Sequence, residues 1–193
     1  MLRNTRKTIS RQLKERSWIF ILLFVFFASG VAAGCNNFQL TEENSTSIIA
    51  YFSGESDFRQ VVYDSFVKNF KLVLLIFAGG VSLVGIPLIL YFLFIKGVSM
   101  GAAVCALISV SSSKQLTVIF YLLPHIIFLV IAILVLGYRS FVFSGVLCRN
   151  ILFSKRHRIN TGDSFFTLAV TFLISVFLCY LSALCEGYFV PDV

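Results

Sequence analysis

Charged residues and prolines are scarce in this chain of 193 residues. Only 13% of the residues are charged, about half of what a soluble domain carries, and only 3 are proline. Hydrophobic residues make up 58% and lie in long uninterrupted runs, which are typical of a chain surrounded by lipid. This composition excludes a soluble enzyme, a nucleic-acid-binding domain and a disordered tail. It predicts an all-α integral membrane protein, with residues 1–193 forming a single polytopic domain.

Acidic residues are absent from the middle of the chain, between Asp64 and Asp163. Proton relays and cation sites in membranes generally use carboxylates, so ion-coupled transport has no obvious machinery here. The sequence also shows no Ser/His/Asp set, no His-Glu-x-x-His motif and no phosphate-binding loop. Its five cysteines have no metal-ligand spacing. We therefore expect a protein that is not an enzyme, with no catalytic residues, no metal site and no cofactor.

Five apolar stretches are long enough, or nearly so, to cross a bilayer as a helix, which takes about 20 residues. They cover residues 18–33, 72–95, 98–113, 116–136 and 165–185. Residues 1–17 (net charge +5) and 138–163 (+4) are basic, whereas residues 34–69 (−3) and the tail after Cys185 (−2) are acidic. Because basic segments stay in the cytoplasm, the pattern predicts a five-helix transmembrane bundle with a cytoplasmic N-terminus, a cytoplasmic loop at 138–163 and the C-terminus outside.

Small residues in two of these stretches are candidates for close helix packing and for contacts with partners. Gly30 and Gly34 form a Gly-x-x-x-Gly face on the first stretch. The same region, ending in Gly34 and Cys35, also resembles a lipoprotein signal peptide in which Cys35 would be acylated. Gly97 and Gly101 leave the third stretch little bulk, so we expect it to be the buried element of the bundle.

The predicted outer loop at 34–69 contains a candidate docking helix. Phe58, Val62 and Phe66 recur at helical spacing with polar residues between them. This predicts an amphipathic helix that leads into the second stretch. Its apolar face would either lie on the outer leaflet or bind an external partner.

Four residues stand out in the apolar stretches or between them. Pro87 should bend the second stretch, because proline removes a backbone donor. Lys96 and Gly97 indicate a tight turn after it, with the Lys96 ammonium at the inner interface. Pro124 and His125 lie in the middle of the fourth stretch, where His125 needs a polar partner: the carbonyl freed by Pro124, or a Ser or Thr of a neighbouring helix. His125 would serve either packing or proton and ligand binding.

The order of several short motifs resembles the stage II sporulation protein M family over residues 3–185. The matching residues are Asn69, Gly79-Gly80, Gly85-Ile86-Pro87-Leu88-Ile89-Leu90, Phe94-Ile95-Lys96-Gly97, Gly101 and Leu123-Pro124-His125. Many family members continue after this His with Gly and a nearby Glu. This chain has Ile126 and Ile127 with no acid there, so no role of that Glu transfers to it.

The resemblance implies a small polytopic protein that is needed for engulfment in endospore-forming bacteria. Such a protein anchors two peptidoglycan hydrolases, an amidase/endopeptidase and a lytic transglycosylase, at the sporulation septum. We therefore expect a non-enzymatic scaffold in the cell membrane, in contact with lipid and with these hydrolases and not with nucleic acid. The alternative is a permease-like subunit that works with a separate ATPase and has a polar cavity around His125 and Lys96.

Overall fold

The computed structural model describes residues 2–38, 58–82, 84–110, 115–152 and 161–189, and all its regular structure is helical. The helices are α1 (Leu2–Asn36), α3 (Phe58–Val81), α4 (Gly85–Val110), α5 (Gln115–Leu152) and α6 (Thr161–Phe189). The prediction of an all-helical fold is confirmed.

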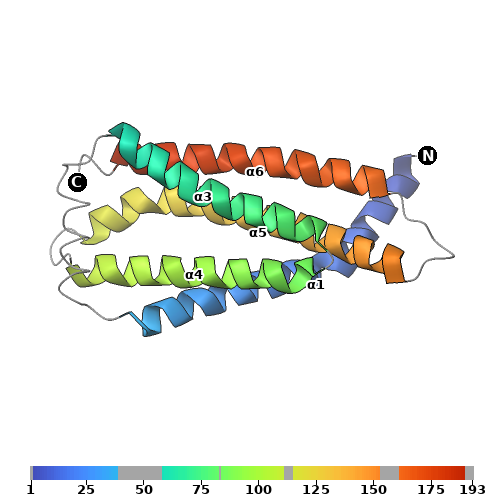
Figure 1. Ribbon diagram of the computed structural model, residues 1–193, viewed down its shortest axis with the longest axis horizontal. Helices are drawn as coiled ribbons and strands as arrows, with labels where there is room; N and C mark the ends of the chain where they lie inside the picture. The colour runs from blue at the N-terminus through green and yellow to red at the C-terminus, as the bar shows by residue number, and fades with distance from the viewer. Residues whose placement is uncertain (1, 39–57, 83, 111–114, 153–160, 190–193) are drawn as a thin grey trace.

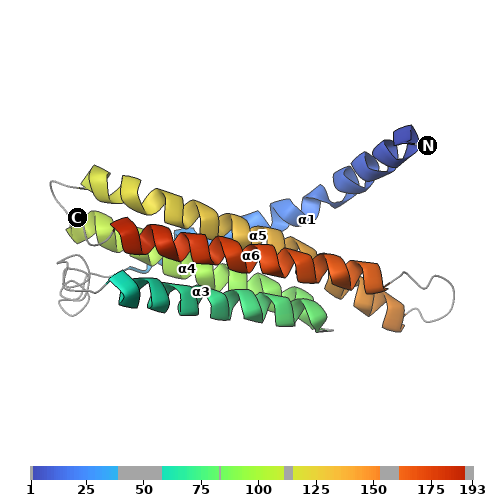
Figure 2. The same ribbon diagram turned by 90° about the horizontal axis from the view of Figure 1, so that it is seen from above.

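The helices lie lengthwise beside one another in a single elongated bundle (Figure 1). Helices α3, α4, α5 and α6 alternate in direction, and α1 runs alongside α4 in the same direction (Figures 1 and 2). The first part of α1 leaves the bundle and extends away from it (Figure 2). The N-terminal end of α1 and the C-terminal end of α6 lie at opposite ends of the molecule (Figure 1).

Four of the described helices contain stretches long and apolar enough to cross a membrane. These stretches are Ser17–Asn36, Gly85–Ala106, Pro124–Asn150 and Gly162–Tyr188. Helix α3 is not among them, and the part from Phe58 to Lys71 carries Arg59, Asp64, Lys68 and Lys71. Length and composition thus support a membrane protein with four candidate spanning helices among the described residues, and they give no support for the fifth predicted span.

The predicted helix over residues 72–95 is wrong, because the chain turns back between Val81 and Gly85. The Ser82 amide donates to the Gly79 carbonyl (3.0 Å), and the Gly85 amide donates to the Ser82 carbonyl (3.2 Å). A side chain at position 85 would collide with the Gly79 carbonyl oxygen, so this close approach requires glycine.

The predicted bend at Pro87 and the predicted turn at Lys96-Gly97 are also wrong. Helix α4 is continuous from Gly85 to Val110 and includes both sites. Pro87 lies in the first turn of α4, where the backbone donor that proline lacks has no partner within the helix. Pro87 therefore helps α4 to begin rather than to bend.

The basic segment at 138–163 is not a loop over its whole length, because α5 continues to Leu152. Phe143 and Val146 are buried on one face of this extension, while Arg139 and Arg149 are exposed. Burial of one apolar face keeps the chain helical beyond the predicted end at residue 136. At the other end of the molecule, the predicted outer loop gives way to α3 from Phe58 onward, and residues 39–57 lie outside the described part.

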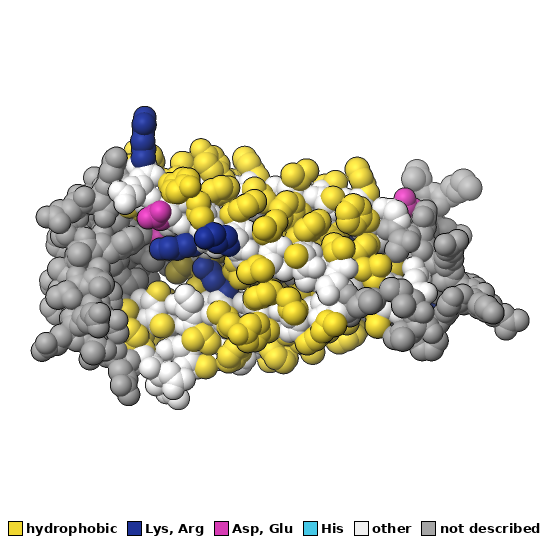
Figure 3. Space-filling model, viewed as in Figure 1, with side chains coloured by type: hydrophobic (Ala, Val, Ile, Leu, Met, Phe, Trp, Pro, Cys, Tyr) yellow, Lys and Arg dark blue, Asp and Glu magenta, His cyan; other side chains and the backbone are white. Residues whose placement is uncertain are grey.

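The core of the bundle is an apolar seam to which all five helices contribute. Its fully buried members include Leu23, Ile76, Leu93, Ile133 and Leu168. Many large apolar side chains are also exposed on the outside of the helices, and the face seen in the space-filling view is mostly apolar between its ends (Figure 3). An apolar exterior around an apolar core is expected where lipid replaces water.

Candidate functional site: a polar layer inside the bundle

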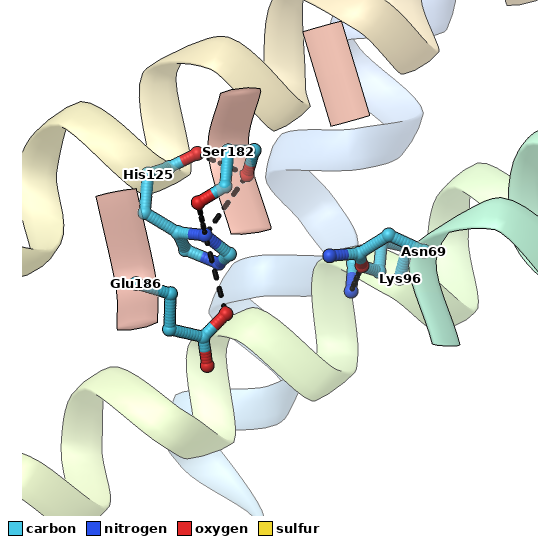
Figure 4. Close-up of polar contacts among 5 residues, drawn as sticks. All are labelled: Asn69, Lys96, His125, Ser182 and Glu186. Atoms are coloured by element: carbon cyan, nitrogen blue, oxygen red, sulfur yellow. Dashed lines mark hydrogen bonds and ion pairs between the residues drawn. The ribbon is translucent and has the colours of Figure 1, made fainter. Parts of the chain in front are cut away.

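Five polar side chains from four helices lie near one another inside the bundle (Figure 4). They are Asn69 of α3, Lys96 of α4, His125 of α5, and Ser182 and Glu186 of α6. We call this group the polar layer. The sequence predicted two of its members, Lys96 and His125, as candidate functional residues. The structure adds the partners that each of them uses.

Lys96 lies halfway along the apolar stretch of α4, not at a helix end. At 1.5 Å per residue it is about 16 Å from Gly85 and about 15 Å from Ala106. Its Nζ donates to Oδ1 of Asn69 at 3.0 Å, and Asn69 is only 4% exposed. The predicted position of Lys96 at a helix end is therefore wrong. A partly buried ammonium between apolar helices needs an acceptor, and Asn69 of the neighbouring helix provides it.

His125 is buried between α5 and α6 and faces three oxygen atoms with a single ring nitrogen. Its Nδ1 lies 3.0 Å from the Ser182 carbonyl oxygen, 2.9 Å from Ser182 Oγ and 3.3 Å from Glu186 Oε2. Because a carbonyl can only accept, Nδ1 carries a hydrogen. The Ser182 hydroxyl then donates to the His125 carbonyl oxygen at 3.0 Å. The prediction of a Ser or Thr partner on a neighbouring helix is confirmed.

Glu186 is the residue that the sequence reasoning missed. It follows the last predicted span and was counted with the acidic outer tail, but α6 continues to Phe189 and keeps it within the helix. Its carboxylate lies beside His125 although no acidic residue is near His125 in the sequence. Glu186 and Lys96 are also close enough to attract each other, which connects the two halves of the polar layer. The spacing of Ser182 and Glu186, one helical turn apart, was the available signal.

The arrangement around His125 differs from that of a catalytic triad. In a triad the hydroxyl and the carboxylate contact opposite ring nitrogens, so that one nitrogen takes the proton of the nucleophile. Here Ser182 and Glu186 both contact Nδ1. The contacts join α5 to α6, and they leave the Ser182 hydroxyl bonded to the backbone of α5.

The predicted small-residue faces meet each other within the chain. Added side chains at Gly30 and Gly34 would collide with the backbone of Phe94 and Val98, and at Gly97 and Gly101 with the backbone of α1. The Cys35 thiol donates to the Gly101 carbonyl oxygen at 3.3 Å across the same contact. We call this contact the glycine seam. Because α1 and α4 fill it, it offers no surface to an external partner.

The predicted docking helix also packs within the chain. Phe58 and Val62 border Gly187 of α6, where an added Cβ would lie 3.1 Å from the Phe58 ring. The Phe66 ring lies edge-on to Tyr180 of α6, with ring centroids 5.9 Å apart. These residues therefore help to hold the first half of α3 against α6, while Phe58 remains 40% exposed.

Long apolar helices joined by a few buried polar contacts are the architecture of a polytopic membrane protein. A family model described as Stage II sporulation protein M matches residues 19–191, which include the whole polar layer and the glycine seam. The chain belongs to the stage II sporulation protein M family, a family of sporulation membrane proteins, as the resemblance predicted. No curated protein and no solved structure matches the chain.

Proposed function

We propose that the protein is a non-enzymatic membrane scaffold that positions peptidoglycan hydrolases at the septal membrane during engulfment. The observation that carries this proposal is the mutual pairing of the polar layer: Asn69 pairs with Lys96, and His125 with Ser182 and Glu186. Groups paired across helices fasten a bundle in a fixed shape. Membership in a sporulation family agrees with this role. The proposed partners are an amidase/endopeptidase and a lytic transglycosylase.

We infer further that α3 crosses the membrane together with the other four helices, with the N-terminus in the cytoplasm. Helix α3 runs lengthwise along the bundle and contacts α4, α5 and α6 (Figure 1). An odd number of crossings agrees with chain ends at opposite ends of the bundle (Figure 1). With five crossings, Arg139 and Arg149 lie on the same side of the membrane as the basic N-terminal segment. This agrees with the rule that basic segments stay on the cytoplasmic side.

A transport role is the second candidate, because ionisable groups at membrane depth generally serve function. Lys96, His125 and Glu186 are three such groups in one network. A permease-like subunit would use them to hold or pass an ion or a polar substrate, and it would bind a cytoplasmic ATPase.

One double variant distinguishes the scaffold function from the transport function. The double variant Asn69→Leu/Lys96→Met replaces a polar contact by an apolar one of similar size, so a scaffold should keep its shape. We expect sporulating cells with this variant to complete engulfment, and the tagged protein to retain both hydrolases on purification in mild detergent. Loss of engulfment with a stably inserted variant, or recovery of a cytoplasmic ATPase in place of the hydrolases, would favour transport. An unrelated tagged polytopic protein is the control for recovery.

A further inference from the structure

The outward face of α3 carries a line of charged side chains. Asp64, Lys68 and Lys71 follow one another at intervals of about one turn and are all exposed. Among the described residues, neither Lys68 nor Lys71 forms an ion pair. Lys and Arg side chains gather over α3 in the space-filling view, with apolar surface on both sides (Figure 3). We call Asp64, Lys68 and Lys71 the charged stripe.

The charged stripe reaches the depth at which the other helices are apolar. The hydrogen bond from Lys96 to Asn69 places this part of α3 level with the midpoint of the apolar stretch of α4. Lys68 and Lys71 lie within about 3 Å of Asn69 along the axis of α3. Lys68 is also close enough to Lys96 for their charges to repel. The two exposed lysines are thus near the middle of the bilayer if α3 crosses it as proposed.

Exposed side chains on the two helices beside α3 are apolar at a similar level. Ile95 of α4 is 44% exposed, and Phe177 of α6 is 60% exposed. A charged side chain in contact with lipid at the centre of a helix costs about 2.5–3.5 kcal/mol on insertion scales. Two such lysines on one face of one helix therefore indicate that something other than acyl chains covers this face.

We propose that the charged stripe binds a membrane-crossing helix of another protein that carries Asp or Glu side chains near its midpoint. The stripe is linear and parallel to the axis of α3, which suits a helix packed lengthwise. Two lysines three residues apart match two carboxylates at the same spacing on the facing helix. This inference deepens the proposed scaffold function, since it gives the surface and the chemistry by which a hydrolase with a membrane anchor would be held.

Two other occupants fit the stripe less well. A second copy in the same orientation would be related by an axis along the membrane normal, which places identical residues at equal depth. Lys68 and Lys71 would then face their own counterparts and repel them. Lipid phosphates lie about 15 Å from the bilayer centre, which is beyond the reach of a lysine side chain at this depth.

The test uses purified full-length protein in phosphatidylcholine vesicles and synthetic leucine-rich transmembrane peptides. One peptide carries two central Glu residues three positions apart, and the matched peptide carries Gln at the same positions. Energy transfer between labelled protein and labelled peptide measures binding at pH 8. We expect the Glu peptide to bind about tenfold more tightly than the Gln peptide. The variant Lys68→Gln/Lys71→Gln should lose this preference, and Arg59→Gln, which removes a charge at the outer end of the same helix, should keep it.

Charge reversal keeps the test meaningful if the Gln variant folds poorly. The variant Lys68→Glu/Lys71→Glu should prefer a peptide with two central Lys residues. Equal binding of the Glu and Gln peptides to the unmodified protein would overturn the proposal, as would a Glu preference that survives Lys68→Gln/Lys71→Gln. If added phosphatidylglycerol competes with the Glu peptide, lipid is the occupant and the proposal is overturned. If protein copies show energy transfer that Lys68→Gln/Lys71→Gln abolishes, a second copy is the occupant and the proposal is likewise overturned.

Failure of the proposed scaffold function and failure of the proposed docking site give different experimental results. If the Glu preference holds while neither hydrolase co-purifies from sporulating cells, the docking site stands and the hydrolases are the wrong partners. If the hydrolases co-purify equally well with Lys68→Gln/Lys71→Gln and the peptides show no preference, the scaffold role stands and the docking site is wrong.

Discussion

His125 Nδ1 lies 3.3 Å from Glu186 Oε2 although the two residues belong to different helices and are separated by most of the second half of the chain. The side chains of both are largely buried, and Ser182 contacts the same ring nitrogen. The contact fixes the position of α5 against α6 toward the end of the bundle. Its contribution to stability can be measured directly.

We expect His125→Ala to lower the free energy of unfolding by about 1–2 kcal/mol, because it leaves Glu186 and Ser182 without their shared partner. Glu186→Gln keeps an oxygen within reach and should cost less. A double-mutant cycle between the two positions, measured by SDS titration in mixed micelles, should give a coupling of about 0.6–1.7 kcal/mol. The control Ile127→Ala removes a large exposed side chain from the same helix. A coupling indistinguishable from zero would mean that the contact does not form.

The Lys96–Asn69 hydrogen bond should show the asymmetry that is typical of buried polar pairs. Asn69→Leu leaves the ammonium without its acceptor, and Lys96→Met leaves the buried amide without its donor. We expect each single variant to be less stable by about 1–3 kcal/mol. The double variant Asn69→Leu/Lys96→Met should recover most of this loss, since an apolar pair of similar size fills the same space. The same unfolding assay compares the stabilities of the three variants. If the double variant loses as much stability as the two single variants together, the prediction is contradicted.

The glycine seam should tolerate no side chain. We expect Gly97→Ala to lower the free energy of unfolding by about 1–3 kcal/mol, because the new Cβ would collide with the backbone of α1 at Phe27. Gly145→Ala is the matched control, since nothing lies within 4 Å of its Cβ position. It should raise stability by about 0.5–1 kcal/mol through the better helix propensity of alanine. Equal effects of the two substitutions would show that α1 and α4 are not in close contact.

Two neighbouring serines of α5 should respond in opposite directions to the same substitution. Ser140 is fully buried and its hydroxyl has no hydrogen-bond partner among the described residues, whereas the Ser144 hydroxyl donates to the Ser82 carbonyl oxygen at 3.1 Å. Ser140→Ala should therefore stabilise the protein by up to about 1 kcal/mol, and Ser144→Ala should destabilise it by about 1 kcal/mol. Thermal unfolding in detergent compares the two. A loss of stability in Ser140→Ala would show that its hydroxyl is satisfied in the membrane.

Hydropathy predicts the first and last spanning helices better than those in the middle of the sequence. The first and last predicted spans fall within α1 and α6, because each is a single apolar run. The turn before Gly85 lies inside another apolar run, where hydropathy does not change as the chain reverses. Gly85 and Pro87 were the local signals for a helix start. The sequence instead predicts a bent helix that ends at Lys96, because a charged residue at the end of an apolar run usually marks the end of a spanning helix.

The sequence predicts Lys96 and His125 as members of the polar layer but not their partners Asn69 and Glu186. A sequence identifies a buried Lys or His as needing a partner, but it does not give the register of two antiparallel helices. Asn69 falls in the predicted outer loop and Glu186 in the predicted tail, so the predicted topology separates both from Lys96 and His125. Their roles follow from the pairing of α3 with α4 and of α5 with α6.

The orientation in the membrane predicts which positions a charged reagent can reach. In a variant with all five cysteines replaced by Ala, single cysteines at Asn37, Val84 and Arg149 probe three exposed sites near helix ends. If α3 crosses the membrane and the N-terminus is cytoplasmic, an impermeant maleimide should label Asn37→Cys in intact cells. It should label Val84→Cys and Arg149→Cys only after permeabilisation, because Val84 follows α3 and Arg149 lies in the last turn of α5, where each helix has returned to the cytoplasmic side. Labelling of Val84→Cys from outside would show that α3 does not cross. The charged stripe would then lie in water rather than in lipid, and the argument for an acidic partner helix would fail with it.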